Sequence, residues 1–288
     1  MNTTSFNRDN SNLIIIEKKN EVYITVDCES DVQREISEFF TFYVPGYKFM
    51  PAYRTRMWDG KIRLFSQKTK EIYFGLYPYI KAFAEERGYN IVAAKDVDID
   101  NKVDKDVVTK FSNSLGQKFE ARDYQIDAIF HSLKRNRTLL VSPTASGKSF
   151  IIYSLIRYYT HLIKENVNNR ILLIVPTTSL VEQMYTDFES YGWNVKKYCH
   201  RLYSGYSNQT DKKVLISTWQ SLYKLPKSYF EQFGCVFGDE AHLFKSKSLT
   251  EIMTKLIDCK YRIGLTGTLD GAHTHKLVLE GLFGAVNK

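Results

Sequence analysis

The chain has 288 residues, 43% hydrophobic and 25% charged, which is the composition of an ordinary soluble protein with room for two modest domains. Its longest apolar run, residues 171–175, is far shorter than the about 18 residues of a membrane span, and its polar start lacks the apolar core of a secretory signal. These features exclude a membrane protein and predict a cytoplasmic one, while the formal net charge of +8 favours a polyanionic partner.

Residues 1–95 predict a small α+β domain. Short β-branched and aromatic runs indicate strands over residues 13–16, 22–26, 47–49, 61–65 and 72–74. Apolar residues at helical spacing follow Ser30, and a second helix is expected from Tyr77 to Arg87, where Gly88 ends it. Residues 96–112 carry both signs of charge and few aromatics, so they are expected to form a charged linker or a solvated helix.

Residues 113–288 show a repeated strand–helix pattern. Short apolar runs predict strands over residues 138–141, 170–175, 214–217, 235–237 and 262–265. Longer helical stretches alternate with them, notably residues 149–164 and 179–191. Strands that are buried on both faces and separated by helices predict an α/β domain with a parallel, doubly wound sheet.

A phosphate-binding loop is predicted between the strand that ends at Val141 and the helix that follows it. The loop comprises Ser142, Pro143, Thr144, Ala145, Ser146, Gly147, Lys148 and Ser149, with Ser142 where a glycine is usual. Backbone amides at such a helix start point at phosphates, so we expect Lys148 on the β and γ phosphates of ATP and Ser149 on Mg²⁺. The alternative is a helix N-terminus that happens to read Gly-Lys-Ser.

An apolar strand that ends in Asp239-Glu240-Ala241-His242 supplies the second element. If this strand lies beside the loop, Asp239 reaches the Mg²⁺ ion and Glu240 orients and deprotonates the attacking water. Lys148, Asp239 and Glu240 are therefore the candidate catalytic residues. The alternative for the acidic pair alone is a helix cap, but a preceding loop in the right order makes coincidence improbable.

Six segments resemble the motifs of superfamily-two helicases and follow that family's order. They are residues 119–125, the loop at 143–149, residues 175–183 (motif Ia), 217–222 (motif Ic), 239–242 (motif II) and 265–268 (motif III). The likeness to phage recombination and repair helicases extends into the N-terminal domain, through residues 47–49, 58–64 and 75–83. It implies a RecA-like P-loop domain, preceded by the small α+β domain, in the cytoplasm of an infected host.

The resemblance also implies roles by position. In the family's pattern Gln125 reads the adenine edge, Arg122 supports the site and Phe119 stacks on the base. The nucleic-acid backbone contacts would be Pro176, Thr177, Thr178, Thr218 and Gln220. The residues that couple the γ-phosphate to that contact would be His242, Thr266, Gly267 and Thr268. The implied cofactors are ATP and Mg²⁺, and the implied partner is DNA, single-stranded or branched, with an RNA–DNA hybrid as a further substrate and no membrane.

The N-terminal domain carries a separate clue in seven basic residues between Lys48 and Lys70, against the single acid Asp59. Aromatic residues, including Trp58, are interleaved with them. Basic residues for phosphates and aromatics for bases predict a DNA contact, for which the candidates are Arg54, Arg56, Lys61 and Arg63. The alternative is a hairpin with a solvated basic face and a core tryptophan.

The expected function is an ATP-dependent DNA helicase or translocase that acts on forks, R-loops and junctions in phage recombination, repair or replication. The chain ends at Lys288, before the second RecA-like domain of such motors, which is expected downstream or from another chain. Hydrolysis by this half alone is expected to be weak or absent, because the missing arginine is worth roughly 10³ in rate or more. Two alternatives stay open: a truncated DNA-binding or regulatory module without turnover, and a duplex translocase of the restriction or chromatin-remodeller type.

Overall fold

The computed structural model describes residues 12–143, 146–243, 246–268 and 273–287. The chain divides into two compact units, the first made of residues 1–98 with 271–281 and the second of residues 99–270 with 282–288. Within the described ranges, every helix is too short or too polar to cross a lipid bilayer.

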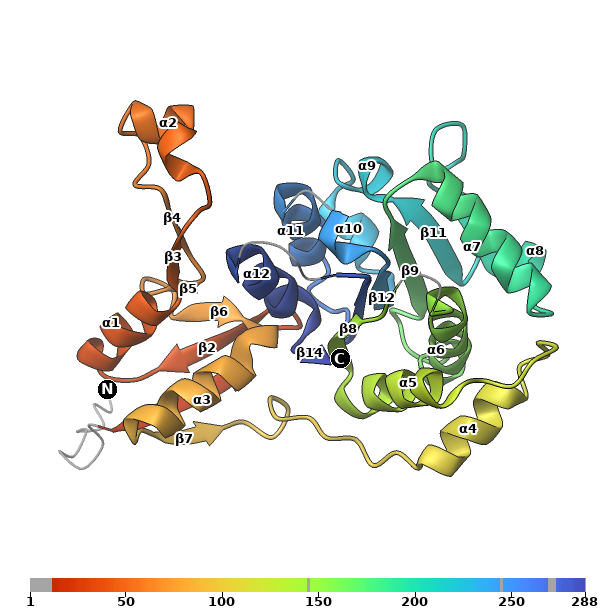
Figure 1. Ribbon diagram of the computed structural model, residues 1–288, viewed down its shortest axis with the longest axis horizontal. Helices are drawn as coiled ribbons and strands as arrows, with labels where there is room; N and C mark the ends of the chain where they lie inside the picture. The colour runs from red at the N-terminus through yellow and green to blue at the C-terminus, as the bar shows by residue number, and fades with distance from the viewer. Residues whose placement is uncertain (1–11, 144–145, 244–245, 269–272, 288) are drawn as a thin grey trace. The chain divides into compact units, whose positions relative to one another are not determined.

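The first unit is built on a five-stranded sheet in the order β5-β6-β2-β1-β7 (Figure 1). Its strands are β1 (Leu13–Lys18), β2 (Tyr23–Asp27), β5 (Phe65–Ser66), β6 (Glu71–Tyr73) and β7 (Asn90–Ala93). β1 pairs antiparallel with β2 and parallel with β7. Alternate residues of the two central strands, Ile14, Ile16, Ile24 and Val26, are fully buried, as expected for a sheet with one covered face.

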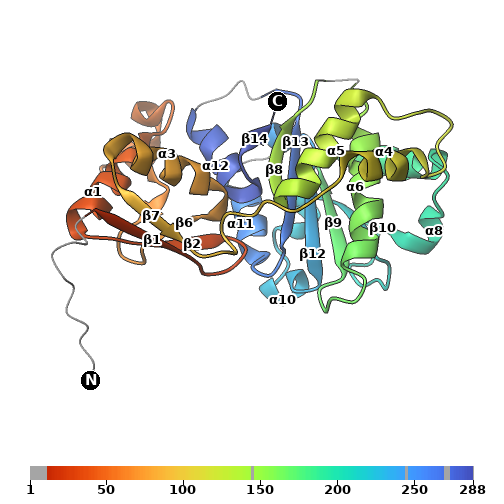
Figure 2. The same cartoon turned by 90° about the horizontal axis from the view of Figure 1, so that it is seen from below.

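Helices α1 (Ser30–Phe39) and α3 (Tyr77–Arg87) lie over one face of this sheet (Figure 2), and the short η3 (Phe74–Leu76) leads into α3. Phe39 and Phe83 join the two helices, with ring centroids 5.2 Å apart. Helix α12 (His273–Phe283) belongs to this unit as far as residue 281. Tyr79 donates a 2.6 Å hydrogen bond to the buried carboxylate of Glu280. The predicted α+β fold is thus completed by a segment from near the end of the chain.

A two-stranded sheet, β3 (Thr41–Tyr43) and β4 (Lys61–Arg63), leads to a turn that contains η2 (Tyr47–Phe49) and α2 (Pro51–Arg54) (Figure 1). The predicted strand over residues 47–49 is wrong, because these residues form a single 3₁₀ turn. Proline cannot donate a ladder hydrogen bond, so Pro51 begins a short helix instead of extending a strand. The predicted strand over residues 61–65 is divided between β4 and β5, which lie in different sheets.

The second unit contains a seven-stranded parallel sheet in the order β10-β11-β9-β12-β13-β8-β14. Its strands are β8 (Arg137–Val141), β9 (Arg170–Val175), β10 (Cys199–Leu202), β11 (Val214–Thr218), β12 (Phe233–Gly238), β13 (Tyr261–Thr266) and β14 (Val286–Asn287). The predicted parallel α/β fold is confirmed. The strands missed from the sequence, β10 and β14, are the two edge strands, where burial on both faces is incomplete.

Helices lie on both faces of this sheet (Figure 2). They are α4 (Lys105–Asn113), α5 (Asp123–Arg135), α6 (Lys148–Leu162), α7 (Thr178–Ser190), α8 (Val195–Tyr198), α9 (Trp219–Leu222), α10 (Lys227–Phe230), η4 (Ala241–Leu243) and α11 (Ser246–Lys255). Helix α4 forms within the segment predicted as a charged linker or a solvated helix. The side chain of Asp104 caps it by accepting a 2.8 Å bond from the amide of Asp106, and Val108 is buried in the core of the second unit.

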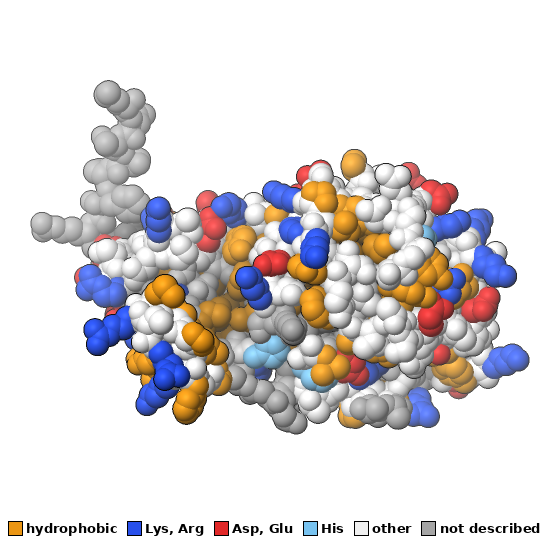
Figure 3. All heavy atoms as spheres, turned by 90° about the horizontal axis from the view of Figure 1, so that it is seen from above, with side chains coloured by type: hydrophobic (Ala, Val, Ile, Leu, Met, Phe, Trp, Pro, Cys, Tyr) orange, Lys and Arg blue, Asp and Glu red, His pale blue; other side chains and the backbone are white. Residues whose placement is uncertain are grey.

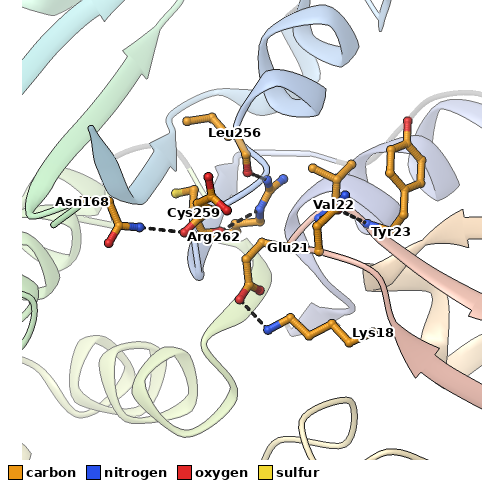
Figure 4. Close-up of polar contacts among 10 residues, drawn as sticks. Lys18, Glu21, Val22, Tyr23, Asn168, Leu256, Cys259 and Arg262 are labelled. Atoms are coloured by element: carbon orange, nitrogen blue, oxygen red, sulfur yellow. Dashed lines mark hydrogen bonds and ion pairs between the residues drawn. The ribbon is translucent and has the colours of Figure 1, made fainter. Parts of the chain in front are cut away.

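Arg262 lies fully buried near the start of β13 (Figure 4). Its guanidinium group donates hydrogen bonds to the carbonyl oxygens of Met253, Leu256, Cys259 and Leu282. Three of these carbonyls belong to the last turn of α11 or to the residues just after it, where helical carbonyls have no partner within the helix. One charged side chain therefore ties the end of α11 to β13.

Candidate nucleotide-binding site

Four neighbouring strands bring the predicted motifs to one edge of the sheet. In the order β9-β12-β13-β8, their carboxyl ends lead to Pro176, Asp239, Gly267 and Ser142. The amide of Ser142 donates a 2.9 Å bond to the carbonyl of Thr266, and the amide of Asp239 donates one of the same length to Ile174. Ligands of α/β sheets bind outside the carboxyl ends of the strands, so this edge is the candidate site.

The loop after β8 is closed at its base by two serines. The hydroxyl oxygens of Ser142 and Ser146 lie 2.5 Å apart, so the residue at the usual glycine position bridges the loop. Gly147 has a φ of 76°, and a Cβ atom there would lie 2.4 Å from Nε2 of Gln125. The left-handed backbone therefore favours a glycine, and any side chain here would also have to displace the end of Gln125. The predicted residues Thr144 and Ala145 lie outside the described residues.

Lys148, the first residue of α6, forms an ion pair with Glu240, which follows β12. The other carboxylate oxygen of Glu240 accepts a 3.3 Å bond from the amide of Gly267 and lies 3.4 Å from Nδ1 of His242. Glu240 has a φ of 48°, a left-handed conformation that costs a non-glycine residue about 1 kcal/mol or more. A single strained residue thus connects the phosphate-binding loop with motifs II and III.

Asp239 is only 3% exposed, and its burial, together with the neighbouring charge of Glu240, raises its pKa to about 6. Its buried Oδ1 atom accepts no hydrogen bond from the residues that the structure describes. A buried carboxylate oxygen without a partner is costly unless a ligand satisfies it. A hard divalent cation such as Mg²⁺ fits this position, because it takes oxygen ligands and would favour the ionised carboxylate.

Ser149 contacts side chains that the sequence did not single out. Its hydroxyl lies 2.9 Å from that of Tyr191, which follows α7. It also hydrogen-bonds Asp187; burial raises the pKa of this carboxyl, and the bond with Ser149 opposes the rise. Neither residue belongs to a motif, and only the packing of α7 beside α6 brings them here. A hydroxyl that donates to one of these groups still has a lone pair for a metal ion.

A hydroxyl group joins motifs II and III. Oγ1 of Thr266 lies 2.6 Å from Nδ1 of His242 and donates a 2.6 Å bond to the carbonyl of Thr268. Because a hydroxyl carries one hydrogen, Nδ1 of His242 must carry its own proton and donate it to Thr266. The four predicted coupling residues therefore meet in one hydrogen-bonded group around Glu240.

The first turn of α5 is tied to the loop. The carbonyl of Ser146 accepts bonds from the hydroxyl of Tyr124 at 2.8 Å and from the side-chain Nε2 of Gln125 at 3.1 Å. Arg122 is exposed and donates a 3.1 Å bond to the Tyr124 hydroxyl. Phe119 keeps 47% of its surface exposed. A cavity of about 570 Å³ beside the loop is lined in part by Arg122, Tyr124 and Pro143.

The N-terminal region and the second region of this chain each match a known protein family. Residues 14–94 match the family described as DNA helicase UvsW, N-terminal, and residues 118–271 match the family described as type III restriction enzyme, res subunit. A crystal structure of the UvsW helicase from bacteriophage T4 is 34% identical, with a TM-score of 0.85, and the match covers 96% of this chain and 99% of that one. The chain belongs to the UvsW family.

Two curated proteins are similar to this chain in sequence. The ATP-dependent DNA helicase uvsW of Enterobacteria phage T4 is 34% identical over 275 residues, which cover 92% of this chain and 54% of that protein. The DNA 3'-5' translocase XPB2 of Sulfurisphaera tokodaii is 27% identical over 224 residues, 71% of this chain and 46% of that protein. This UvsW-family chain therefore spans about half the length of the curated relatives it matches.

The predicted backbone-contacting residues of the motor lie at the ends of β9 and β11, which are neighbouring parallel strands. Thr177 and Thr178, at the start of α7, are exposed, and so is Gln220 in α9. Pro176 and Thr218 are buried. Of the five predicted nucleic-acid contacts in this UvsW-family chain, Thr177, Thr178 and Gln220 therefore have exposed side chains.

The basic candidates of the UvsW N-terminal region, Arg54, Arg56, Lys61 and Arg63, lie on the two-stranded sheet and its turn. Arg63 forms an ion pair with Asp59, and Nζ of Lys61 lies 4.9 Å from the ring centre of Tyr43. Trp58 is half-buried, and its indole donates a 2.9 Å bond to the carbonyl of Lys61. Figure 3 shows Lys and Arg side chains mixed with hydrophobic ones at this end of the unit, at the lower left of the view.

Proposed function

We propose that this chain is the ATP-binding half of an ATP-dependent DNA helicase or translocase that acts on forks, R-loops and junctions in phage recombination, repair or replication. One observation carries the proposal: Lys148, Asp239 and Glu240 meet at one edge of a parallel sheet, in a chain of the UvsW family. Lysine and carboxylates so placed are the groups that phosphoryl transfer to water requires. A DNA substrate agrees with the net charge of +8.

The proposed roles follow from the chemistry of each group. Lys148 neutralises the β and γ phosphates, and Glu240 orients and deprotonates the attacking water. Asp239 and Ser149 would hold Mg²⁺, which would supply positive charge against the charge that develops on the phosphates. Gln125 reads the adenine edge, with Arg122 in support, and Phe119 offers an exposed ring for stacking. Thr177, Thr178 and Gln220 contact the DNA backbone, and the group around Thr266 couples that contact to the γ-phosphate.

We assign residues 1–95 to a DNA-contacting domain, 96–112 to the connection and 113–288 to the first RecA-like domain, except that residues 271–281 cluster with the N-terminal unit. The second RecA-like domain, which supplies an arginine to the transferring phosphate, comes from downstream or in trans. That arginine is commonly worth roughly 10³ in rate or more, so this chain alone binds nucleotide but hydrolyses it poorly. If this chain alone hydrolyses no ATP at all, it acts as a DNA-binding or regulatory module without turnover.

A second candidate is translocation along duplex DNA without strand separation. The match to the type III restriction family and the likeness to a protein named as a DNA translocase favour it. R-loops carry an RNA–DNA hybrid, so a motor of either kind can meet that hybrid as well. The two candidates differ in whether the strands come apart.

The test compares this chain with one extended through the downstream reading frame. Steady-state ATPase is measured with and without forked DNA, and strand displacement is measured beside displacement of a triplex-forming oligonucleotide. DNA-stimulated hydrolysis by the extended chain that Glu240→Gln abolishes supports the motor. Triplex displacement without strand displacement selects the duplex translocase. Failure of both chains to bind an ATP analogue sinks the proposal.

A further inference from the structure

The turn between β3 and β4 exposes two large apolar side chains. Phe49, at the end of η2, is 86% exposed, and Met57, shortly after α2, is 80% exposed. These two residues are called the apolar tip below. Exposing side chains of this size to water forgoes roughly 1.5–3 kcal/mol each relative to burial, so two of them in one short turn make it a candidate contact surface.

The turn that carries the apolar tip is stiffly built. The ring of Tyr47 stacks on that of Tyr43 with centroids 4.6 Å apart and meets that of Tyr53 edge-on at 4.8 Å. Gly60 leaves room for this stack, because a Cβ atom there would lie 2.3 Å from the Tyr47 ring. A two-stranded sheet is marginal alone, and these aromatic contacts hold it in place of a core.

The residues around the apolar tip carry a net positive charge, which favours a polyanion as the binding partner. Neither Arg54 nor Arg56 has an ion-pair partner among the residues that the structure describes, and no acid other than Asp59 occurs between residues 44 and 70. Asp59 is itself neutralised by Arg63. A cavity of about 610 Å³ is lined in part by Arg54, Arg56 and Met57. Met57 and the two arginines therefore face the same cavity, and Phe49 is exposed in the same turn.

We infer that the apolar tip packs against the unstacked bases at the branch point of a DNA fork, while Arg54 and Arg56 hold the adjoining phosphates. This inference rests on the proposed function, because it takes DNA as the partner. The faces of bases within a duplex are covered by stacking, so an apolar side chain finds one only at a branch, an end or a kinked step. The apolar tip therefore recognises the branched structure of the DNA and not its base sequence.

The test uses forks with 2-aminopurine either at the branch-point pair or within the duplex arm, each at a protein concentration that saturates binding. We expect the unmodified chain to change the branch-point fluorescence by about two-fold or more, as unstacking does, and to leave the arm unchanged. The double variant Phe49→Ala/Met57→Ala is expected to lose most of that change. Phe49→Trp is expected to keep it, because a larger ring still covers a base.

Two controls separate packing from charge. Val167→Ala removes a fully exposed apolar side chain from the second unit and is expected to leave the signal unchanged. Arg54→Gln/Arg56→Gln is expected to weaken fork binding and to reduce the salt slope of log K by about 2. A full branch-point signal from the double alanine variant, in bound complexes, overturns the inference alone. An unmodified chain that binds no DNA at all removes the proposed function together with it.

Discussion

Lys148 and Glu240 are ion-paired although 92 positions separate them in the chain. In the proposed reaction the lysine binds phosphate and the carboxylate acts on water, so the pair must open when ATP enters. The pair therefore competes with ATP for the ammonium group. Both side chains are largely shielded from solvent, so dissolved salt screens the attraction between Lys148 and Glu240 only weakly.

Glu240→Gln removes the negative partner and leaves an amide oxygen that can still accept a bond from Gly267. We expect the dissociation constant of an ATP analogue to fall about five-fold, which corresponds to roughly 1 kcal/mol of released pairing. Titration with a fluorescent nucleotide measures this. Lys148→Ala is the control and should lose binding. Equal or weaker binding by the glutamine variant contradicts the competition.

Asp239 should destabilise the protein when no metal ion is bound. Its pKa is raised from 3.8 to about 6, so the folded state binds the proton more tightly than the unfolded state does. The stability that this proton contributes is present below pH 4 and is lost as the pH rises through about 6. At pH 7 to 8 the buried charge is therefore a cost of about 1–3 kcal/mol.

Asp239→Asn removes that cost, so we expect the variant to melt at a higher temperature than the unmodified chain at pH 7.5 in EDTA. The difference should shrink toward pH 4, where the aspartate is protonated. Adding Mg²⁺ with an ATP analogue should stabilise the unmodified chain and not the variant. Thermal melts over this pH range measure all three effects, and a lower melting temperature for the variant at pH 7.5 would refute the assignment.

The sequence predicted the sheet better than the contacts around it. Central strands such as β9 and β12 are buried on both faces, so their continuous apolar runs can be recognised from the sequence alone. The motif residues directly follow these strands. Parallel pairing alone therefore brings them together at one edge of the sheet. Edge strands and the turn at residues 47–49 lack that signal, because short mixed runs suit a strand or a 3₁₀ turn equally.

The unpredicted parts of the site depend on packing between distant segments. Tyr191 reaches Ser149 because α7 packs beside α6, and nothing local to Tyr191 indicates this. Likewise, residues 271–281 cluster with the first unit, and the buried Glu280 there is paired with Tyr79. Such pairings join residues far apart in the chain, so periodicity and motif spacing carry no information about them.

Arg262 should be among the most costly positions to substitute. Arg262→Leu leaves up to four buried carbonyl groups without their donor, and each unsatisfied group costs about 1 kcal/mol or more. We expect a loss of at least about 3 kcal/mol in the free energy of unfolding, measured by urea denaturation. Lys260→Ala, at an exposed neighbouring cation, should change it by less than about 0.5 kcal/mol. A loss below 1 kcal/mol for the leucine variant would show that water reaches these carbonyls.

The hydroxyl of Thr266 offers the sharpest test of coupling between nucleotide and DNA. Thr266→Val keeps the shape of the fully buried side chain and removes the acceptor of the His242 proton and the donor to Thr268. Among the described residues, that nitrogen of the imidazole then keeps Glu240 as its neighbour. Among the described residues, the bond from the amide of Gly267 to Glu240 still joins motif II to motif III, so the coupling between them should weaken.

We therefore expect the ratio of DNA dissociation constants with and without a non-hydrolysable ATP analogue to move toward one in the valine variant. A coupling of 1–3 kcal/mol corresponds to a ratio of about 5–150 in the unmodified chain, so the loss is readily measured by fluorescence anisotropy. Thr160→Val is the matched control, because its hydroxyl bonds only to the carbonyl of Ile156, within α6 and far along it from the loop. The control should keep the ratio. An unchanged ratio in Thr266→Val would mean that the state of the nucleotide reaches the DNA contact by another route, since the hydroxyl is the direct hydrogen-bonded link between His242 and motif III.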